Sequence, residues 1–359
     1  MRIRDSGFRI RDKGLGIAAA LAVAGAAAIA VAGAAAIGEW QPQTSGVTGR
    51  LRGVSAVSDR AAWASGANGT VLRTVDGGTT WQTLTVPGAE KLDFRDIDAM
   101  SDRVAYVLSI GPGEASRIYK TTDAGAHWTL QLANTDPKVF LDAMAFWDER
   151  RGIAFSDSVD GQFVIFETSD AGAAWTRIPS DRLPPALPNE GAYAASGSNV
   201  AMTGSRDVWI GTTAARVLHS SDGGRTWTIA RTPLATGSSA GIFSIAFRDS
   251  RHGVVVGGDY RKETEALENV ATTSDGGATW TPVTARGLSG FRSAVAWIPG
   301  SRSTWLAVGP SGADRSADDG RTWTPEARDG LDAISFAPRA RAGWGTGARG
   351  RIARVVWSN

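Results

Sequence analysis

The chain has 359 residues, 42% of them hydrophobic, so it is long enough to bury a substantial core. Its 38 basic and 36 acidic residues give a formal net charge of +2, and five of the basic residues lie within the first 38 positions. The remaining chain is close to neutral, which argues against nucleic-acid binding, and the absence of cysteine excludes disulfides and thiol chemistry.

Residues 1–38 have the layout of an export signal. Residues 1–13 are cationic, and residues 14–38 form an uncharged run of Ala, Gly, Ile, Leu and Val. The small residues at 34–36 suit cleavage, although the run at 14–38 is also long enough to anchor the chain in a bilayer. Cleavage is favoured because alanine adds little hydrophobicity. We therefore expect an exported, periplasmic or otherwise extracytoplasmic protein whose folded domain spans residues 39–359.

The two ends of this domain complement one another. Residues 39–44 resemble the strand that follows each repeat described below, but no blade precedes them. Residues 331–357 supply three strand-like runs, and residues 350–354 match residues 69–73. We therefore expect the strand after Trp40 to pair near residues 352–356, which would close a ring and remove exposed sheet edges.

An eight-residue pattern, hereafter the box, begins at Thr74 and recurs along the chain. In each copy a Ser or Thr is followed at fixed spacing by Asp, Gly and Trp, and successive copies are 43 to 53 residues apart. The box residues are Asp76/Trp81, Asp123/Trp128, Asp170/Trp175, Asp222/Trp227, Asp275/Trp280 and Asp318/Trp323. A period of this size indicates a repeat architecture.

Each box is interpreted as a structural turn. Aspartate accepts hydrogen bonds from backbone amides a few residues further on, and glycine tolerates the positive φ of a tight reversal. The tryptophan is expected to begin the next strand and to bury its rings against a neighbouring sheet while its N–H bonds to a carbonyl. A calcium site is disfavoured because each box offers only one carboxylate. No metal or cofactor is expected.

The residues around the first box alternate between apolar and polar, as half-buried strands do. They predict strands at 52–58, 61–65, 70–74 and 81–85. The inner strands of the later repeats are expected to begin at Arg95, Leu141, Tyr193, Phe243, Arg292 and Leu331. The predicted fold is all-β: a seven-bladed β-propeller of four-stranded antiparallel blades, with the last blade closed by N- and C-terminal strands.

Strand direction divides the connections between two faces. The boxes lie on one face, so the opposite face collects the beginnings of the inner strands. The same face carries residues 179–191, which include four prolines, and the charged insertion 261–269. Because loops often carry function, a binding site is expected on this face.

Aligned inner strands place charged side chains at the mouth of the channel, three arginines at one level and three aspartates at the next. The candidate binding residues are Arg52, Arg95, Arg292, Asp96, Asp142, Asp332, Tyr193 and Tyr260. Converging guanidinium groups could bind carboxylates of a partner through paired hydrogen bonds, and the tyrosines could add contact area. The competing interpretation is a solvated rim of salt bridges.

The six boxes and their spacing resemble those of the Asp-box (BNR) repeat propellers, and within them the photosystem II assembly and stability factor-like family of exported proteins. The resemblance covers residues 39–359. It implies a non-catalytic scaffold that binds and helps to assemble protein or membrane-protein complexes through an arginine-bearing patch. Only Arg52, Arg95 and Arg292 occupy positions to which that patch could be transferred. We expect a monomer with a protein partner and no cofactor.

Sialidases and other glycosidases also carry boxes, so the alternative is a sialidase-like glycoside hydrolase that binds an anionic sugar. That chemistry needs an arginine trio, a Tyr–Glu nucleophile pair and an aspartic acid/base. Tyr193 with Glu190, or Tyr260 with Glu263, could supply the pair. The Arg-Ile-Pro motif that precedes the first box in sialidases is missing here, and the usual order of catalytic residues is not reproduced.

Other chemistries find little support. The three histidines are dispersed, which disfavours a histidine metal site. Residues 257–259 form no phosphate-binding loop, because no strand-to-helix context follows them. Asp157 and Asp160 are interpreted as part of an ordinary polar turn. The preferred hypothesis is therefore the binding scaffold.

Overall fold

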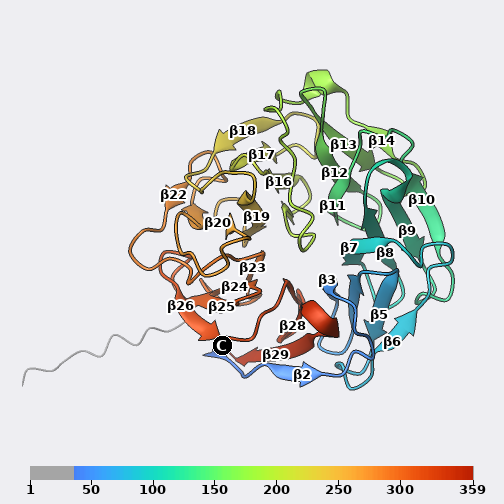
Figure 1. Cartoon of the computed structure of the whole chain (residues 1–359), viewed down its shortest axis with the longest axis horizontal. Coiled ribbons are helices and arrows are strands. Elements are labelled where there is room, and N and C mark those ends of the chain that lie inside the picture. Colours follow the sequence, from blue (N-terminus) through green and yellow to red (C-terminus); the bar gives the residue numbers. More distant parts are fainter. Residues whose placement is uncertain (1–35, 359) are drawn as a thin grey trace, which may run out of the picture. The chain divides into compact units, whose positions relative to one another are not determined.

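The computed structural model describes residues 36–358, whose regular structure is almost entirely β-strand. Seven antiparallel sheets follow one another around a ring, and each sheet is one blade (Figure 1). The predicted seven-bladed propeller is confirmed. Most of the predicted leader, residues 1–35, lies outside the described residues. Within 36–358 no helix is long and apolar enough to span a bilayer.

Each blade runs from an inner strand at the channel to an outer strand at the rim. The inner strands are β3 (Leu51–Ala56), β7 (Asp93–Ala99), β11 (Leu141–Phe146), β15 (Val200–Thr203), β19 (Ala240–Phe247), β23 (Ala294–Trp297) and β27 (Ala333–Phe336). The second strands are β4 (Ala62–Gly66), β8 (Ala105–Ile110), β12 (Gly152–Val159), β16 (Asp207–Gly211), β20 (Gly253–Asp259), β24 (Trp305–Gly309) and β28 (Ala342–Thr346). The third strands are β5 (Thr70–Thr74), β9 (Arg117–Thr121), β13 (Gln162–Thr168), β17 (Arg216–Ser220), β21 (Val270–Thr273), β25 (Gly312–Ser316) and β29 (Ile352–Ser358). The outer strands are β6 (Gln82–Leu84), β10 (Thr129–Ala133), β14 (Thr176–Arg177), β18 (Thr228–Arg231), β22 (Thr281–Pro282) and β26 (Thr324–Ala327), with β2 (Gln41–Gln43) and β1 (Ala36–Ile37) in the seventh blade. Short 3₁₀ turns occur at η1 (Gly113–Ala115), η2 (Ser180–Arg182) and η3 (Ala348–Gly350).

Five of the six predicted inner-strand starts lie within three residues of the observed ones. The prediction for the fourth blade is wrong, because β15 begins at Val200 and not at Tyr193. Residues 191–199, hereafter the plug, leave the sheet and reach side chains of other blades. The small apolar residues of the plug resemble a strand in sequence, but they make irregular contacts described below.

The seventh blade closes the ring as predicted. Strand β2 pairs with β29 in the register Gln41↔Arg354, Pro42↔Ala353 and Gln43↔Ile352. Strand β1 pairs with the far end of β29. Both termini therefore belong to one blade, and the C-terminal strand has no open edge along these pairs.

The box side chains hold their own turns. In the first box the Thr74 hydroxyl donates to Asp76 at 2.9 Å and accepts from the Gly78 backbone at 2.9 Å. Asp76 also accepts from the Thr80 backbone at 3.0 Å and from its hydroxyl at 2.6 Å. The contacts from Ser or Thr to Asp and from Gly to Ser or Thr recur in all six boxes. Because these hydrogen bonds occupy the oxygens of the box carboxylates, few acceptor sites remain for a ligand.

The box tryptophans do not begin the outer strands, so that prediction is corrected. Each tryptophan lies one residue before its outer strand, because it still belongs to the turn. Pairing with the third strand begins at the following residue, as in Thr129↔Lys120 and Thr176↔Glu167. The tryptophans concerned are Trp81, Trp128, Trp175, Trp227, Trp280 and Trp323.

The predicted hydrogen bond from the indole N–H to a carbonyl forms in some boxes and not in others. The indoles that donate to the glycine carbonyl of their own box, at 2.9–3.1 Å, are those of Trp227, Trp280 and Trp323, and their side chains are buried. The prediction is wrong for Trp128 and Trp175, whose indole nitrogens have no hydrogen-bond partner within residues 36–358. Their half-buried rings lie edge-on to Trp63 and Phe146, with centroids 6.4 and 5.9 Å apart. Aromatic packing therefore holds these two side chains without the hydrogen bond.

Neighbouring blades are joined inside the channel by side chains of the inner strands. Backbone amides of one blade donate to Ser335, Ser55, Asp98 or Ser244 of the preceding blade at 2.9–3.2 Å. Apolar clusters fill the space between consecutive sheets, and their side chains are almost fully buried. The ring is therefore stabilised by alternating layers of hydrophobic packing and a lining of hydrogen bonds.

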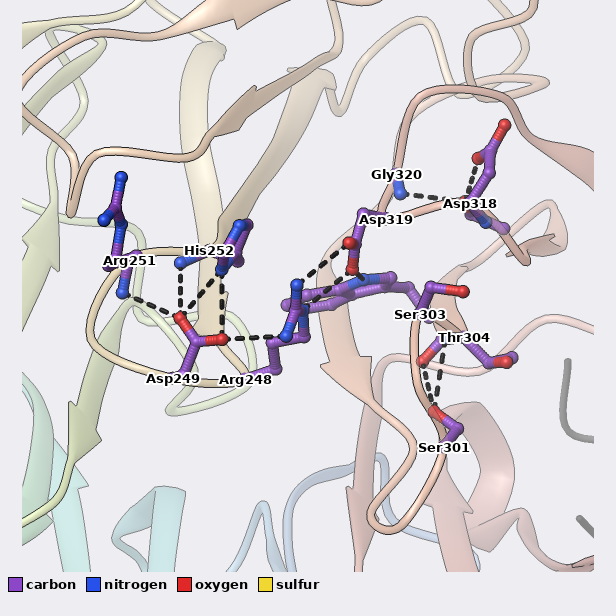
Figure 2. Close-up of polar contacts among 12 residues, drawn as sticks. Arg248, Asp249, Arg251, His252, Ser301, Ser303, Thr304, Asp318, Asp319 and Gly320 are labelled. Carbon is purple, nitrogen blue, oxygen red and sulfur yellow. Dashed lines mark hydrogen bonds and ion pairs between the residues drawn. The ribbon is translucent and has the colours of Figure 1, made fainter. Parts of the chain in front are cut away.

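An ion-pair network links blades 5 and 6 (Figure 2). Arg248, after β19, contacts both carboxylate oxygens of Asp319 at 2.9 and 3.0 Å and also contacts Asp249 at 2.8 Å. Asp319 lies in the sixth box and accepts from the Trp305 indole at 3.3 Å. The nearby His252 contacts Asp249 at 3.0 Å. These ion pairs connect the two blades, so the network has a structural role.

Candidate functional site

A cavity of about 370 Å³ opens at the channel mouth on the face that carries the plug, and we call it the cup. Its wall has three sectors, set by the order of the blades around the ring. Blades 1 and 2 contribute arginines, blade 3 contributes aspartates, and the plug with blades 5 and 6 contributes aromatic rings. The lining residues of these sectors are Arg50, Arg52, Arg95, Asp142, Asp157, Tyr193, Phe243, Tyr260 and Phe291.

The basic sector contains two paired arginines and one without an ion pair. Arg50 contacts both oxygens of Asp332 at 2.7 Å, and Arg95 contacts Asp93 at 2.7 Å. Arg52 forms no ion pair with any residue in 36–358. Burial lowers the pKa of Arg52 to about 10, against a raising effect of Asp332, and nearby Arg95 lowers it further. Arg52 is therefore the guanidinium best placed to gain from an incoming anion.

The plug forms part of the wall of the cup and bonds to three other blades. The backbone carbonyl of Ala194 accepts from Arg95 at 2.8 Å, and that of Ala195 accepts from Arg52 at 3.4 Å. The Ser196 hydroxyl donates to the Ser293 carbonyl of blade 6 at 2.9 Å. The plug thus bonds to side chains of blades 1 and 2 and to the backbone of blade 6, and its residues 192–195 line the cup.

The acidic sector consists of two carboxyls close enough to repel one another. Asp142 is 1% exposed, and its Oδ2 atom has no hydrogen-bond partner among residues 36–358. Burial raises the pKa of Asp142 well above its usual range, and Asp157 raises it further. Burial also raises the pKa of Asp157 to about 6. A hydrogen bond from the Ala192 backbone opposes both shifts.

Close approach of the plug to this sector requires a glycine. A Cβ atom on Gly191 would lie 1.5 Å from Asp157 Oδ1. Gly191 therefore allows the chain to turn against the carboxyl pair and to place the Ala192 amide beside it.

The aromatic sector is a stacked and edge-on group. The Tyr193 and Phe243 rings stack with centroids 3.8 Å apart and an interplanar angle of 6°. Tyr260 lies edge-on to Tyr193 at 6.2 Å, and Phe291 lies edge-on to Phe243 at 4.6 Å. Tyr260 is 39% exposed, so it offers a flat apolar surface at the rim.

The charged insertion covers part of the rim. The Glu263 backbone carbonyl accepts from the Phe291 amide at 3.0 Å and from the Ser311 hydroxyl at 3.0 Å. These bonds hold the exposed Glu263 beside the cup, which it helps to line. The insertion is therefore fixed at its base to blade 6.

Six of the eight candidate binding residues come together in the cup, and two do not. Those in the cup are Arg52, Arg95, Asp142, Asp332, Tyr193 and Tyr260. Arg292 is 1% exposed and contacts Asp314 at 2.7 Å, so its expected place at the mouth is corrected. Asp96 is also buried, and it accepts from the Met144 backbone of the next blade at 2.7 Å. Both side chains instead satisfy buried groups within the ring.

The box residues stay apart from the cup. No box side chain lines it, neither the aspartates Asp76, Asp123, Asp170, Asp222, Asp275 and Asp318 nor the tryptophans Trp81, Trp128, Trp175, Trp227, Trp280 and Trp323. The contacts of these side chains lie within the box turns and the adjoining sheets.

Several lining residues were missed by the sequence analysis. Asp157 was interpreted as part of a turn, yet its carboxyl lines the cup. Arg50 precedes the inner strand by one residue, which gave no signal for its pairing with Asp332. Phe243 and Phe291 are ordinary core-type residues in sequence. Their role as a wall depends on the plug, which no local pattern indicated.

The proposed Tyr–Glu pair of a sialidase-like site is not formed by Tyr193. Glu190 is buried, receives a 2.6 Å hydrogen bond from Thr212 and is ion-paired with Arg216. The Tyr193 hydroxyl donates to the Ala240 carbonyl at 3.3 Å. Within residues 36–358 no group of three or more His, Asp or Glu side chains could hold a metal ion.

No family model and no curated protein matches the chain. Its fold is similar to that of YCF48 bound to a D1 peptide, with a TM-score of 0.62, 17% identity, and coverage of 90% of this chain and 99% of that chain. YCF48 from Cyanidioschyzon merolae gives a TM-score of 0.59 at 20% identity, and covers 88% of this chain and 98% of that chain.

Glycoside hydrolases of family GH74 are also similar in structure. The xyloglucanase from Xanthomonas campestris gives a TM-score of 0.58 at 15% identity, covering 88% of this chain and 53% of that chain. An ancestral GH74 enzyme gives a TM-score of 0.61 at 14% identity, covering 89% of this chain and 46% of that chain. The chain thus spans about half the length of these enzymes. At such identities the similarity establishes the fold alone.

Proposed function

We propose that the protein is a non-catalytic scaffold that captures a segment of a partner protein in the cup. The observation that carries the proposal is Arg52, a partly buried guanidinium that has no ion pair within residues 36–358 and lies in a cavity with exposed Tyr260 at its rim. An anionic group of a partner would supply the missing charge, and the aromatic sector would supply contact area. The YCF48 structure with a bound peptide supports this choice, because that chain is matched over nearly its whole length.

The proposal extends to cellular context. The cationic and apolar residues 1–38 support export, and the six boxes support membership of the Asp-box propellers. The partner class is then a protein or membrane-protein complex of the cell envelope, and the scaffold acts as a monomer.

The second candidate is a glycoside hydrolase, and the acidic sector favours it. Two carboxyls with raised pKa values could divide acid and base roles, and GH74 enzymes share the fold. The scaffold is preferred because Glu190 is engaged by Arg216 and cannot assist Tyr193.

The proposal is tested by affinity capture from a cell-envelope extract. We expect the Arg52→Gln/Arg95→Gln double variant to retain the fold and to capture at least about tenfold less partner, because an unpaired anion would be left in the cup. The matched control is Arg103→Gln, an exposed arginine on the box face. Equal capture by both variants would remove the support for the scaffold, and turnover in a parallel glycoside screen would favour the hydrolase.

A further inference from the structure

The acidic sector of the cup lacks the arginine counter-charge that three other buried carboxylates have within residues 36–358. Glu190, Asp314 and Asp332 are each ion-paired with an arginine. Asp142 and Asp157 form no ion pair with any residue in 36–358, although Asp142 is as buried as those three. A buried carboxylate without a cation is costly, so an arrangement that retains two of them beside a cavity needs a reason.

One oxygen of this pair is also without a hydrogen bond. Asp142 Oδ2 is buried and has no hydrogen-bond partner in the described part of the chain, while Asp142 itself lines the cup. The Ala192 amide serves the two carboxyls on the plug side. Both aspartates line the cavity, so a ligand in the cup would lie next to this carboxyl pair. Burial raises the pKa of both carboxyls, and a cation bound beside them would lower it again.

We propose that Asp142 and Asp157 form a subsite for a primary ammonium group on a ligand whose anionic group is bound by Arg52. This inference rests on the proposed function and narrows its partner: the captured segment carries an ammonium close to a carboxylate. The ammonium comes from a lysine side chain or from a free chain terminus. The methylene stem of a lysine could lie along the aromatic sector while its charged end reaches blade 3.

An ammonium fits this subsite better than other donors. It offers three hydrogen-bond donors from a compact charge, and two carboxyls can accept them without fixed planar geometry. A divalent cation would need more oxygen ligands than two carboxyls supply. A neutral sugar hydroxyl could bond to the carboxyl pair, but it would supply no positive charge to it.

Four small ligands test the inference by titration calorimetry with the folded protein. Nα-acetyl-lysine presents a side-chain ammonium, Nε-acetyl-lysine presents an α-ammonium, and Nα,Nε-diacetyl-lysine presents the carboxylate alone. Glucuronate presents a carboxylate with hydroxyls in place of an ammonium. We expect at least one mono-acetyl derivative to bind about tenfold more tightly than the diacetyl derivative, and the stronger one identifies the source of the ammonium.

Variants assign this difference to the acidic sector. Asp142→Asn/Asp157→Asn should abolish the advantage of the ammonium without weakening the binding of diacetyl-lysine. If the double variant fails to fold, Asp157→Asn alone, at the less buried position, should reduce that advantage. Equal binding of mono- and diacetyl derivatives, no binding of either mono-acetyl derivative, or tighter binding of glucuronate would overturn the subsite. Loss of diacetyl-lysine binding in Arg52→Gln tests the anion site separately, so failure of the ammonium subsite is distinguishable from failure of the scaffold proposal.

Discussion

The side-chain oxygen of Gln43 accepts a 3.0 Å hydrogen bond from the indole nitrogen of Trp81, which ties the N-terminal strand to the first box. The amide nitrogen of Gln43 donates to the Gly77 carbonyl at 2.8 Å, and its oxygen also accepts from Trp344 of blade 7 at 3.2 Å. One side chain therefore joins the closing strand to blades 1 and 7. Closure of the ring depends on this group as well as on the β2–β29 ladder.

Replacement of Gln43 by alanine should remove the side-chain hydrogen bonds that connect strand β2 to blades 1 and 7. We expect Gln43→Ala to lower the free energy of unfolding by about 2–4 kcal/mol, since two indole N–H groups and a backbone carbonyl lose their partner. The matched control is Gln41→Ala, an exposed residue of the same strand. Urea denaturation measures both. A Gln43→Ala protein as stable as Gln41→Ala would show that the backbone ladder alone closes the ring.

The residue between Asp and Gly of each box adopts a positive φ. Glycine occupies this place in three boxes, whereas Ala124 and Ala171 adopt φ of 68° and 65°. A left-handed alanine is strained by roughly 1–2 kcal/mol, and glycine recovers part of this against its entropy cost. We expect Ala124→Gly and Ala171→Gly each to stabilise the protein by about 0.5–1 kcal/mol. The control Ala126→Gly, at a position without positive φ, should instead destabilise it slightly in thermal melts.

The repeat architecture was predictable because the residues that form each turn are close together in the sequence. Each box contains both ends of its own hydrogen bonds, such as Thr74 and Asp76, so the turn is visible within eight residues. Closure was predictable because residues 350–354 repeat the pattern of residues 69–73. The indole bonds were predictable only where the acceptor lies in the same box, as for Trp227, and not for Trp128, whose ring packs on another blade.

The site was predictable only in part, because its chemistry depends on partners far apart in the chain. Arg292 and Arg52 occupy equivalent positions at the predicted start of an inner strand. Arg292 nevertheless forms an ion pair with Asp314, whereas Arg52 forms none with residues 36–358. The plug lines the cup, although its residues resemble a strand in sequence. The Asp157 carboxyl lies against Gly191 of the plug, a contact that a sequence pattern cannot show.

The stability of the protein should depend on pH through its buried carboxyls. Burial raises the pKa of Asp98 to about 6 from an ordinary value of 3.8, so the folded state binds more protons than the unfolded state between these values. Stability should therefore fall as pH rises from about 4 to about 6 through this group. Below that range, the box carboxylates act in the opposite direction, since a hydrogen bond from the Thr80 hydroxyl lowers the pKa of Asp76 to about 2.

The variant Asp98→Asn isolates this effect. Its side-chain oxygen can still accept from the Phe146 amide, which Asp98 contacts at 3.2 Å. We expect Asp98→Asn to be more stable than the wild type by about 1–2 kcal/mol at about pH 7 and nearly equal to it at about pH 4. Urea midpoints across this range provide the measurement. A difference that is the same at both pH values would mean that Asp98 does not titrate as described.

Two arginines that look alike in sequence should differ in their effect on stability. Removal of Arg292 leaves the buried Asp314 without its cation, so Arg292→Ala should destabilise the protein by about 3–5 kcal/mol. Arg52 has no ion pair within residues 36–358, and Arg52→Ala should change stability by less than about 1 kcal/mol. Thermal melts of both variants decide the matter. Similar melting temperatures would contradict the separation of a structural from a ligand-facing arginine.

The ring of Tyr260 is 39% exposed at the rim of the cup. If the aromatic sector supplies contact area to a partner, the ring matters and the hydroxyl does not. We expect Tyr260→Ala to weaken partner capture by about tenfold or more, as for an aromatic residue at the centre of an interface, and Tyr260→Phe to bind like the wild type. The control is Leu130→Ala, which removes an exposed apolar side chain of the outer strand β10.

The same pair of variants separates the two candidate functions. A sialidase-like hydrolase would use the Tyr260 hydroxyl with Glu263 in catalysis, so Tyr260→Phe would abolish turnover while preserving the packing of the ring. A scaffold uses the ring alone, because its edge-on contacts with Tyr193 at 6.2 Å and Phe243 at 6.0 Å do not involve the hydroxyl. Glycoside turnover by the wild type that is lost in Tyr260→Phe would therefore replace the scaffold with the hydrolase, whereas capture that survives in Tyr260→Phe and fails in Tyr260→Ala supports the scaffold.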